Sequence, residues 1–179
     1  MQYNVAELLK GPSGARREFE IDEQPQFEMS DAAFLGPLQG RVELMRTQQG
    51  ILVKADLAVE AEVECARCLN PTEIILEVHM QEEFRPTVDI ATGFRTWPEP
   101  DEFVDEETLI DEHHILNLDE AVRQELEASM PIKPLCHAAC AGICPGCGAD
   151  LSEGPCQCEP EVDSRWEALR QMLDESTTQ

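Results

Sequence analysis

The sequence is poor in basic and in aromatic residues. Its 179 residues include 13 Lys and Arg against 37 Asp and Glu, and only two Trp, one Tyr and six Phe. The formal net charge of −24 excludes a basic module that holds nucleic-acid phosphates through counterion release. No apolar run approaches the roughly 18 residues that a membrane-spanning helix needs, and the first 20 residues lack the apolar core of a signal peptide. We therefore expect a cytoplasmic protein with no membrane partner.

The motifs of common catalytic sites are also missing. The sequence contains no Gly-rich phosphate-binding loop, and no Ser/His/Asp constellation can be argued from it. His79, His113 and His114 are interpreted as ordinary surface residues, and the many carboxylates do not form an ordered calcium-binding loop. The sequence therefore predicts a protein that is not an enzyme.

The first half of the chain has the alternating pattern of half-buried strands. Apolar residues take every second position over 57–63 and, with one exception, over 74–80. Shorter alternations at 42–44 and 51–53 are separated by a Gln-Gln-Gly turn, and 19–21 suggests one more strand. Together these segments predict an antiparallel β-sheet of about four or five strands.

The second half contains helical patterns. Apolar residues recur at helical spacing from Asn117 until Pro131 ends the segment, and a capping box of Ser164 and Glu167 begins a second helix. We predict an α+β protein with two helices, organised as one integrated domain. Its parts are a β-sheet region with a Cys-x-x-Cys hairpin (1–85), an acidic irregular connection (86–116), and a helix, a cysteine-rich zinc-binding segment and a C-terminal helix (117–179).

All eight cysteines occur in closely spaced pairs. In a reducing compartment this pattern favours metal binding over disulfides. A structural zinc site is tetrahedral and needs four ligands, so two pairs must combine around each ion. The pairs are Cys65 and Cys68, Cys136 and Cys140, Cys144 and Cys147, and Cys156 and Cys158.

Chain geometry indicates how the pairs combine. The segment from Cys144 to Cys158 can wrap one ion by itself, whereas the hairpin pair at Cys65 has no local partners and must recruit Cys136 and Cys140. We therefore expect two zinc ions. An iron–sulfur cluster, free buried cysteines or a redox pair remain as alternatives, and His137, beside Cys136, could replace a thiolate as a ligand.

The order of these motifs resembles the YceD family, also called the large ribosomal RNA subunit accumulation proteins. The resemblance is carried by Glu64-Cys65-Ala66-Arg67-Cys68-Leu69, Glu82-Glu83-Phe84, Ile110-Asp111 to Met130-Pro131, Lys133-Pro134-Leu135-Cys136, Cys140 to Leu151, Cys156-x-Cys158, and Asp163 to Leu169. One departure is Asp150, where the family more often has Asn before Leu. The resemblance implies a cytoplasmic bacterial protein that is needed for the accumulation or processing of large-subunit ribosomal RNA.

Charge and resemblance together predict a non-catalytic zinc-binding factor in ribosome biogenesis. A strongly acidic protein can reach ribosomal RNA through a basic ribosomal protein or the preribosomal large subunit. Direct RNA contact would need a basic patch, and Arg67 could instead offset thiolate charge. A thiol redox or metal-storage protein is the alternative function, and an RNA-processing enzyme is the third. The candidate partner-binding residues are Arg41, Arg46, Arg67, Arg85 and Lys133.

Overall fold

The computed structural model describes residues 1–96, 106–158 and 164–166. The chain divides into two compact units: one contains Met1–Ala66 and Asn70–Cys136, the other Arg67–Leu69 and His137–Gln179. The strands are β1 (Gln2–Asn4), β2 (Arg16–Glu23), β3 (Ala33–Phe34), β4 (Leu38–Arg46), β5 (Ile51–Glu64), β6 (Pro71–Pro86), β7 (Leu109–Ile110) and β8 (Ile115–Asn117). The helices are α1 (Ala6–Lys10) and α2 (Asp119–Ser129), with 3₁₀ turns η1 (Glu106–Thr108) and η2 (Ser164–Trp166).

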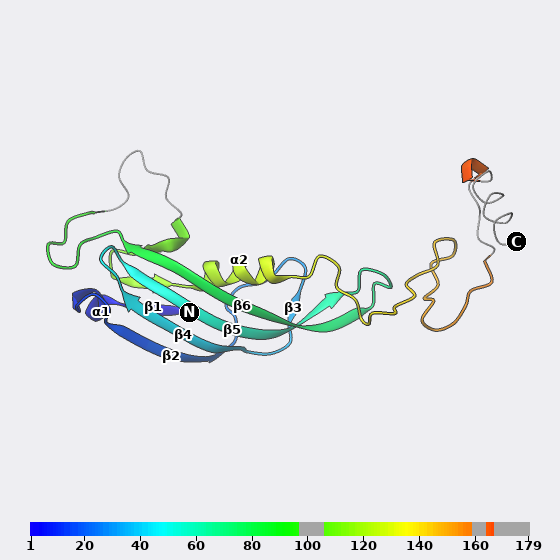
Figure 1. The fold of residues 1–179 in the computed structure, drawn as a ribbon, viewed down its shortest axis with the longest axis horizontal. Helices are drawn as coiled ribbons and strands as arrows, with labels where there is room; N and C mark the ends of the chain where they lie inside the picture. The colour runs from blue at the N-terminus through cyan, green and yellow to red at the C-terminus, as the bar shows by residue number, and fades with distance from the viewer. Residues whose placement is uncertain (97–105, 159–163, 167–179) are drawn as a thin grey trace, which may run out of the picture. The chain divides into compact units, whose positions relative to one another are not determined.

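The first unit is built on one curled sheet with the strand order β1-β8-β7-β6-β5-β4-β2, and β3 also pairs with β5 (Figure 1). The eight strands exceed the predicted four or five, and the β6–β7 pair is parallel, so the expectation of a purely antiparallel sheet is wrong. The missed strands β1, β3, β7 and β8 have only two or three residues each, too few for an alternation to be recognised.

Alternation along β5 separates the two faces of the sheet. Every odd-numbered residue from Ile51 to Val63 is buried, and the even-numbered ones face away from the core. The core face is covered by α2, which packs on β6 and buries Val122 and Leu126 completely (Figure 1). We call the opposite side of the sheet the outer face.

The sheet curls enough to bring its two edge strands together. Tyr3 of β1 and Phe19 of β2 have ring centroids 4.7 Å apart. Gly40, which pairs with Ile21 on one side and Leu57 on the other, has a φ of +148°. Glycine adopts this backbone conformation without the strain a side chain would meet, so β4 can bend there.

The helices agree with the sequence only in part. The predicted helix after Asn117 is α2, whereas α1 was not predicted. The segment 86–116, expected to be irregular, contains η1, β7 and the start of β8. Of the predicted C-terminal helix, Ser164–Trp166 forms η2, and the remainder lies outside the described residues. No helix in the described ranges is long and apolar enough to cross a membrane.

Candidate metal centre

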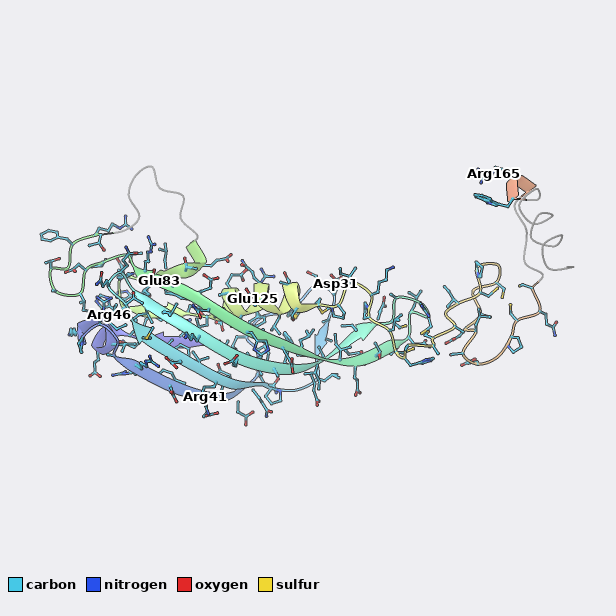
Figure 2. All side chains as sticks on the ribbon, viewed as in Figure 1. Asp31, Arg41, Arg46, Glu83, Glu125 and Arg165 are labelled. Carbon is cyan, nitrogen blue, oxygen red and sulfur yellow. The ribbon has the colours of Figure 1, made fainter. Side chains whose placement is uncertain are left out.

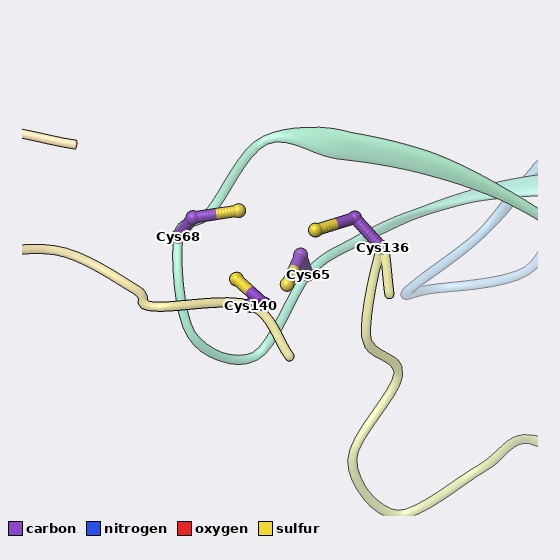
Figure 3. Close-up of side chains that lie close together, drawn as sticks. All are labelled: Cys65, Cys68, Cys136 and Cys140. Atoms are coloured by element: carbon purple, nitrogen blue, oxygen red, sulfur yellow. The ribbon is translucent and has the colours of Figure 1, made fainter. Parts of the chain in front are cut away.

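Four cysteines distant in sequence form the first tetrad. Cys65 and Cys68 come from the turn between β5 and β6, and Cys136 and Cys140 follow α2 (Figure 3). Their Sγ atoms all lie within 4.8 Å of one another. Tetrahedral zinc with Zn–S bonds of about 2.3 Å requires sulfurs about 3.8 Å apart, so this arrangement suits the ion. Cys136 is exposed and the other three are buried.

The second tetrad is local in sequence. Cys144, Cys147, Cys156 and Cys158 also have all Sγ atoms within 4.8 Å of one another. Cys144 is buried, whereas Cys147 and Cys158 are exposed. The structure thus brings the eight cysteines together in the same two sets of four that the sequence predicts, and no disulfide joins any of them. Both clusters are formed by cysteine alone, without the predicted alternative ligand His137.

The two Cys-x-x-Cys turns share two backbone features. The N–H of Cys65 donates to the carbonyl of Asn70 at 2.9 Å, and the N–H of Cys144 donates to the carbonyl of Ala149 at 2.8 Å. In each turn the residue after the second cysteine has a positive φ, +63° at Leu69 and +74° at Gly148. A left-handed conformation costs a non-glycine residue roughly 1–2 kcal/mol. The backbone at Leu69 is therefore strained, whereas the backbone at Gly148 is not. In both turns the two sulfurs lie close together.

Backbone amides favour a thiolate in the second tetrad. Hydrogen bonds from the backbone of Cys147 and then of Gly146 lower the pKa of Cys144 to about 6. The neighbouring sulfurs of Cys147 and then Cys144 raise the pKa of Cys158 to about 12. Four sulfurs this close resist ionising together unless a cation balances them. The donor set therefore fits a divalent thiophilic metal such as zinc.

Arg67, predicted to face a partner, has structural contacts beside the first tetrad. Its Nη1 donates to the carbonyl of Cys140 at 2.8 Å, and its own carbonyl accepts from the N–H of Ile143 at 3.2 Å. A Cβ added at Gly142 would lie 3.0 Å from the same Arg67 carbonyl. Arg67 therefore orients the segment that carries Cys140.

The other basic candidates are placed as follows. Arg41 lies between acidic cross-strand neighbours and forms an ion pair with Glu20 at 3.2 Å. Arg46 donates to the carbonyls of Leu9, Thr47 and Gly50. The two arginines are five positions apart on β4, so their side chains leave opposite faces (Figure 2). Arg85 is partly buried on β6, and Lys133 is exposed after α2.

The structure also shows a residue that the sequence did not distinguish. His114 was interpreted as a surface residue, yet its Nδ1 is buried without a hydrogen-bond partner and its φ is +61°. The backbone at His114 turns back to donate to Asp111 at 3.0 Å. Asp111 also accepts from the N–H groups of His113 and Ile115, so it shapes the tight turn before β8. In the sequence, the signal that could have indicated this turn was Asp111, because aspartate is common at the start of turns.

Comparison with known proteins agrees with this site. The fold and the cysteines define a small curled-sheet protein with two four-cysteine clusters. Residues 53–173 match the family described as "Large ribosomal RNA subunit accumulation protein YceD", a range that contains every cysteine. The chain belongs to the YceD family.

Relatives extend the similarity toward the N-terminus without adding a function. Uncharacterized proteins from Mycobacterium bovis (strain ATCC BAA-935 / AF2122/97) and from two Mycobacterium tuberculosis strains, CDC 1551 / Oshkosh and H37Rv, are 30% identical over 148 residues. The matches cover 80% of this chain, which spans 64% of the length of these curated relatives. No solved structure matches the chain.

Proposed function

We propose that this protein is a non-catalytic zinc-binding factor that supports the accumulation or processing of large-subunit ribosomal RNA. The observation that carries the proposal is the presence of two complete four-sulfur sets in a member of the YceD family. Cys65, Cys68, Cys136 and Cys140 would hold one ion, and Cys144, Cys147, Cys156 and Cys158 the other. Zinc bound by four protein ligands is structural, because no coordination position stays open for a substrate.

The net charge of the metal-loaded protein indicates which kind of partner it binds. Each site of four thiolates and one Zn²⁺ adds −2 to the formal net charge of −24, which gives about −28 for the loaded protein. Such a field repels RNA and attracts basic proteins. A basic ribosomal protein, alone or on the preribosomal large subunit, is therefore the proposed partner.

Co-purification and complementation test the function. Tagged full-length protein recovered from cells should bring down large-subunit proteins and precursor large-subunit RNA. Cells lacking the gene should accumulate less large-subunit than small-subunit RNA. The double variant Cys65→Ala/Cys68→Ala should fail to restore the ratio, whereas Ser30→Ala, a change away from both tetrads, should restore it. A normal RNA ratio in cells lacking the gene would contradict the proposal.

Exposure of Cys147 and Cys158 favours thiol redox or metal storage as a second candidate function. Exposed thiolates are the ones that oxidise readily. This function requires that mild oxidation releases the metal from the second tetrad reversibly, with disulfides formed among its cysteines. Retention of both metals under mild oxidation would reject it.

A further inference from the structure

The outer face of the sheet contains an apolar groove beside β5. Phe34 of β3 pairs with Ala61, whereas Gln39 of β4 pairs with Ala58. Between these two pairs the chain runs five positions, from Phe34 to Gln39, whereas β5 runs only three, from Ala61 to Ala58. The two extra residues interrupt the pairing. The interruption leaves a groove of about 380 Å³. Its lining includes Gly36, Pro37, Gln39, Ala58, Glu60 and Ile75, and we call it the Ile75 groove.

Two exposed apolar side chains belong to this region. Ile75 is 66% exposed although Leu76, the next residue on β6, is buried. Leu35 is 47% exposed, and its N–H donates to the carbonyl of Glu60, the residue directly opposite Ile75. Single exposed apolar residues are common on protein surfaces. Here, however, Ile75 borders a groove that could bury an apolar side chain of a partner.

Carboxylates surround the groove without cross-strand basic neighbours. Glu62 of β5 lies directly opposite Glu73 of β6, and Glu77 lies opposite Ala58. Like charges placed directly opposite each other destabilise a sheet. Farther along the same strands the pairing is different, since Asp56 is 2.9 Å from the Nδ1 of His79. The carboxylates beside the Ile75 groove therefore lack the cross-strand partner that His79 provides for Asp56.

We propose that the Ile75 groove docks a basic polypeptide segment of a partner protein. One apolar side chain of that segment enters the groove, and flanking Lys or Arg side chains lie along Glu60, Glu62, Glu73 and Glu77. Charge complementarity selects this occupant: RNA phosphates and a second copy of this acidic face would both be repelled. The inference rests on the proposed function and gives its basic partner a binding surface.

A synthetic peptide with one leucine between two runs of lysine tests the groove on the full-length, metal-loaded protein. Fluorescence anisotropy should show binding that weakens with salt. Ile75→Thr should weaken binding roughly tenfold, because the leucine of the peptide then loses the apolar surface of Ile75 against which it is buried. Threonine retains the β-branched shape, so the strand should still form. Glu60→Gln/Glu77→Gln should also weaken binding and flatten its salt dependence.

Matched variants separate the groove from general acidity. Ile132→Thr removes an isoleucine that is 97% exposed elsewhere, and Glu18→Gln/Glu112→Gln removes two exposed charges outside the groove. Both should leave binding within about twofold of the unchanged protein. A peptide whose leucine is replaced by serine should bind the unchanged protein and Ile75→Thr equally. Amide shifts on peptide addition should centre on Gly36 and Ile75.

Four results would overturn the inference: no binding of the lysine–leucine peptide, an equal loss with Ile132→Thr, amide shifts centred away from the groove, or displacement of the peptide by single-stranded RNA. These results are distinguishable from failure of the proposed function. If the peptide does not bind the groove while the unchanged protein still co-purifies with large-subunit components, only the inference about the groove is rejected. Absence of those components from the purified complex would instead reject the function.

Discussion

Replacing Gly40 with alanine tests a close backbone approach between β4 and β5. The new Cβ would lie well inside 3.0 Å of the Asp56 carbonyl oxygen and 2.9 Å from the Cα of Leu57, distances that real Cβ atoms essentially never show. Because both obstacles are backbone atoms, β4 and β5 must separate. The φ of +148° adds strain of its own.

The magnitude follows from these two effects. Separation of the strands weakens about two backbone hydrogen bonds, each worth about 0.5–1.5 kcal/mol net. The unfavourable φ costs about 1–2 kcal/mol. The lower chain entropy of the unfolded alanine variant offsets part of this loss, by about 0.4–1 kcal/mol. We expect the free energy of unfolding to fall by about 3 kcal/mol, a large part of the 5–15 kcal/mol typical of a domain.

Urea unfolding followed by far-ultraviolet circular dichroism measures this loss. Gly36→Ala is the matched control, because a Cβ at Gly36 meets nothing within 4 Å. It should change stability by less than about 0.5 kcal/mol. A Gly40→Ala variant that is no less stable than Gly36→Ala would refute the close β4–β5 contact.

Three further results are expected. Burial, followed by the charges of Glu23 and Asp119, raises the pKa of Tyr3 to about 12, so the alkaline absorbance change of this single tyrosine should have its midpoint near 12 in the folded protein and near 10 after denaturation. The neutral phenol thus stabilises the fold fully below pH 10, and this stabilisation disappears as the pH rises through 12. Chelation of the metal should increase amide exchange over 137–158 while the sheet stays protected, because the hydrophobic core contains no residue of that segment. Arg67→Met should lower metal affinity of the first tetrad by roughly tenfold or more, since its bond to Cys140 is lost.

For each of these three predictions, one measured outcome would contradict it. A folded-state tyrosine midpoint near 10 would contradict the burial of the phenol beside Phe19. Unchanged exchange over 137–158 after verified metal removal would show that this segment folds without metal. Equal metal affinity of Arg67→Met and the unchanged protein, measured by competition with a chelator, would show that Arg67 does not orient the Cys140 segment.

Long strands and cysteine pairs were predictable because their signals are local. The alternation in β5 and β6 extends over many residues, and the segment from Cys144 to Cys158 contains four ligands within one loop. The remaining members of the first tetrad followed by elimination. Short elements such as α1, with five residues, have too little sequence to show a period.

Contacts between distant segments were not predictable. Arg67 reaches Cys140 across 73 residues, so no spacing in the sequence indicated that its guanidinium would bond a carbonyl. Gly36 and Pro37 are residues typical of a break between strands, but the groove depends on the register that β3 and β4 adopt against β5. The positive φ angles at Leu69 and His114 could likewise not be predicted from the sequence, because leucine rarely adopts that conformation and histidine does so only occasionally.

The metal content of the protein tests the central claim most directly. Native mass spectrometry of full-length protein purified under reducing conditions should show two zinc ions per chain. Cys65→Ala/Cys68→Ala and Cys144→Ala/Cys147→Ala should each retain one ion, since the tetrads are separate sets of cysteines. Protein that contains neither zinc nor iron, or that loses both ions when either tetrad is altered, would contradict the two-site structure.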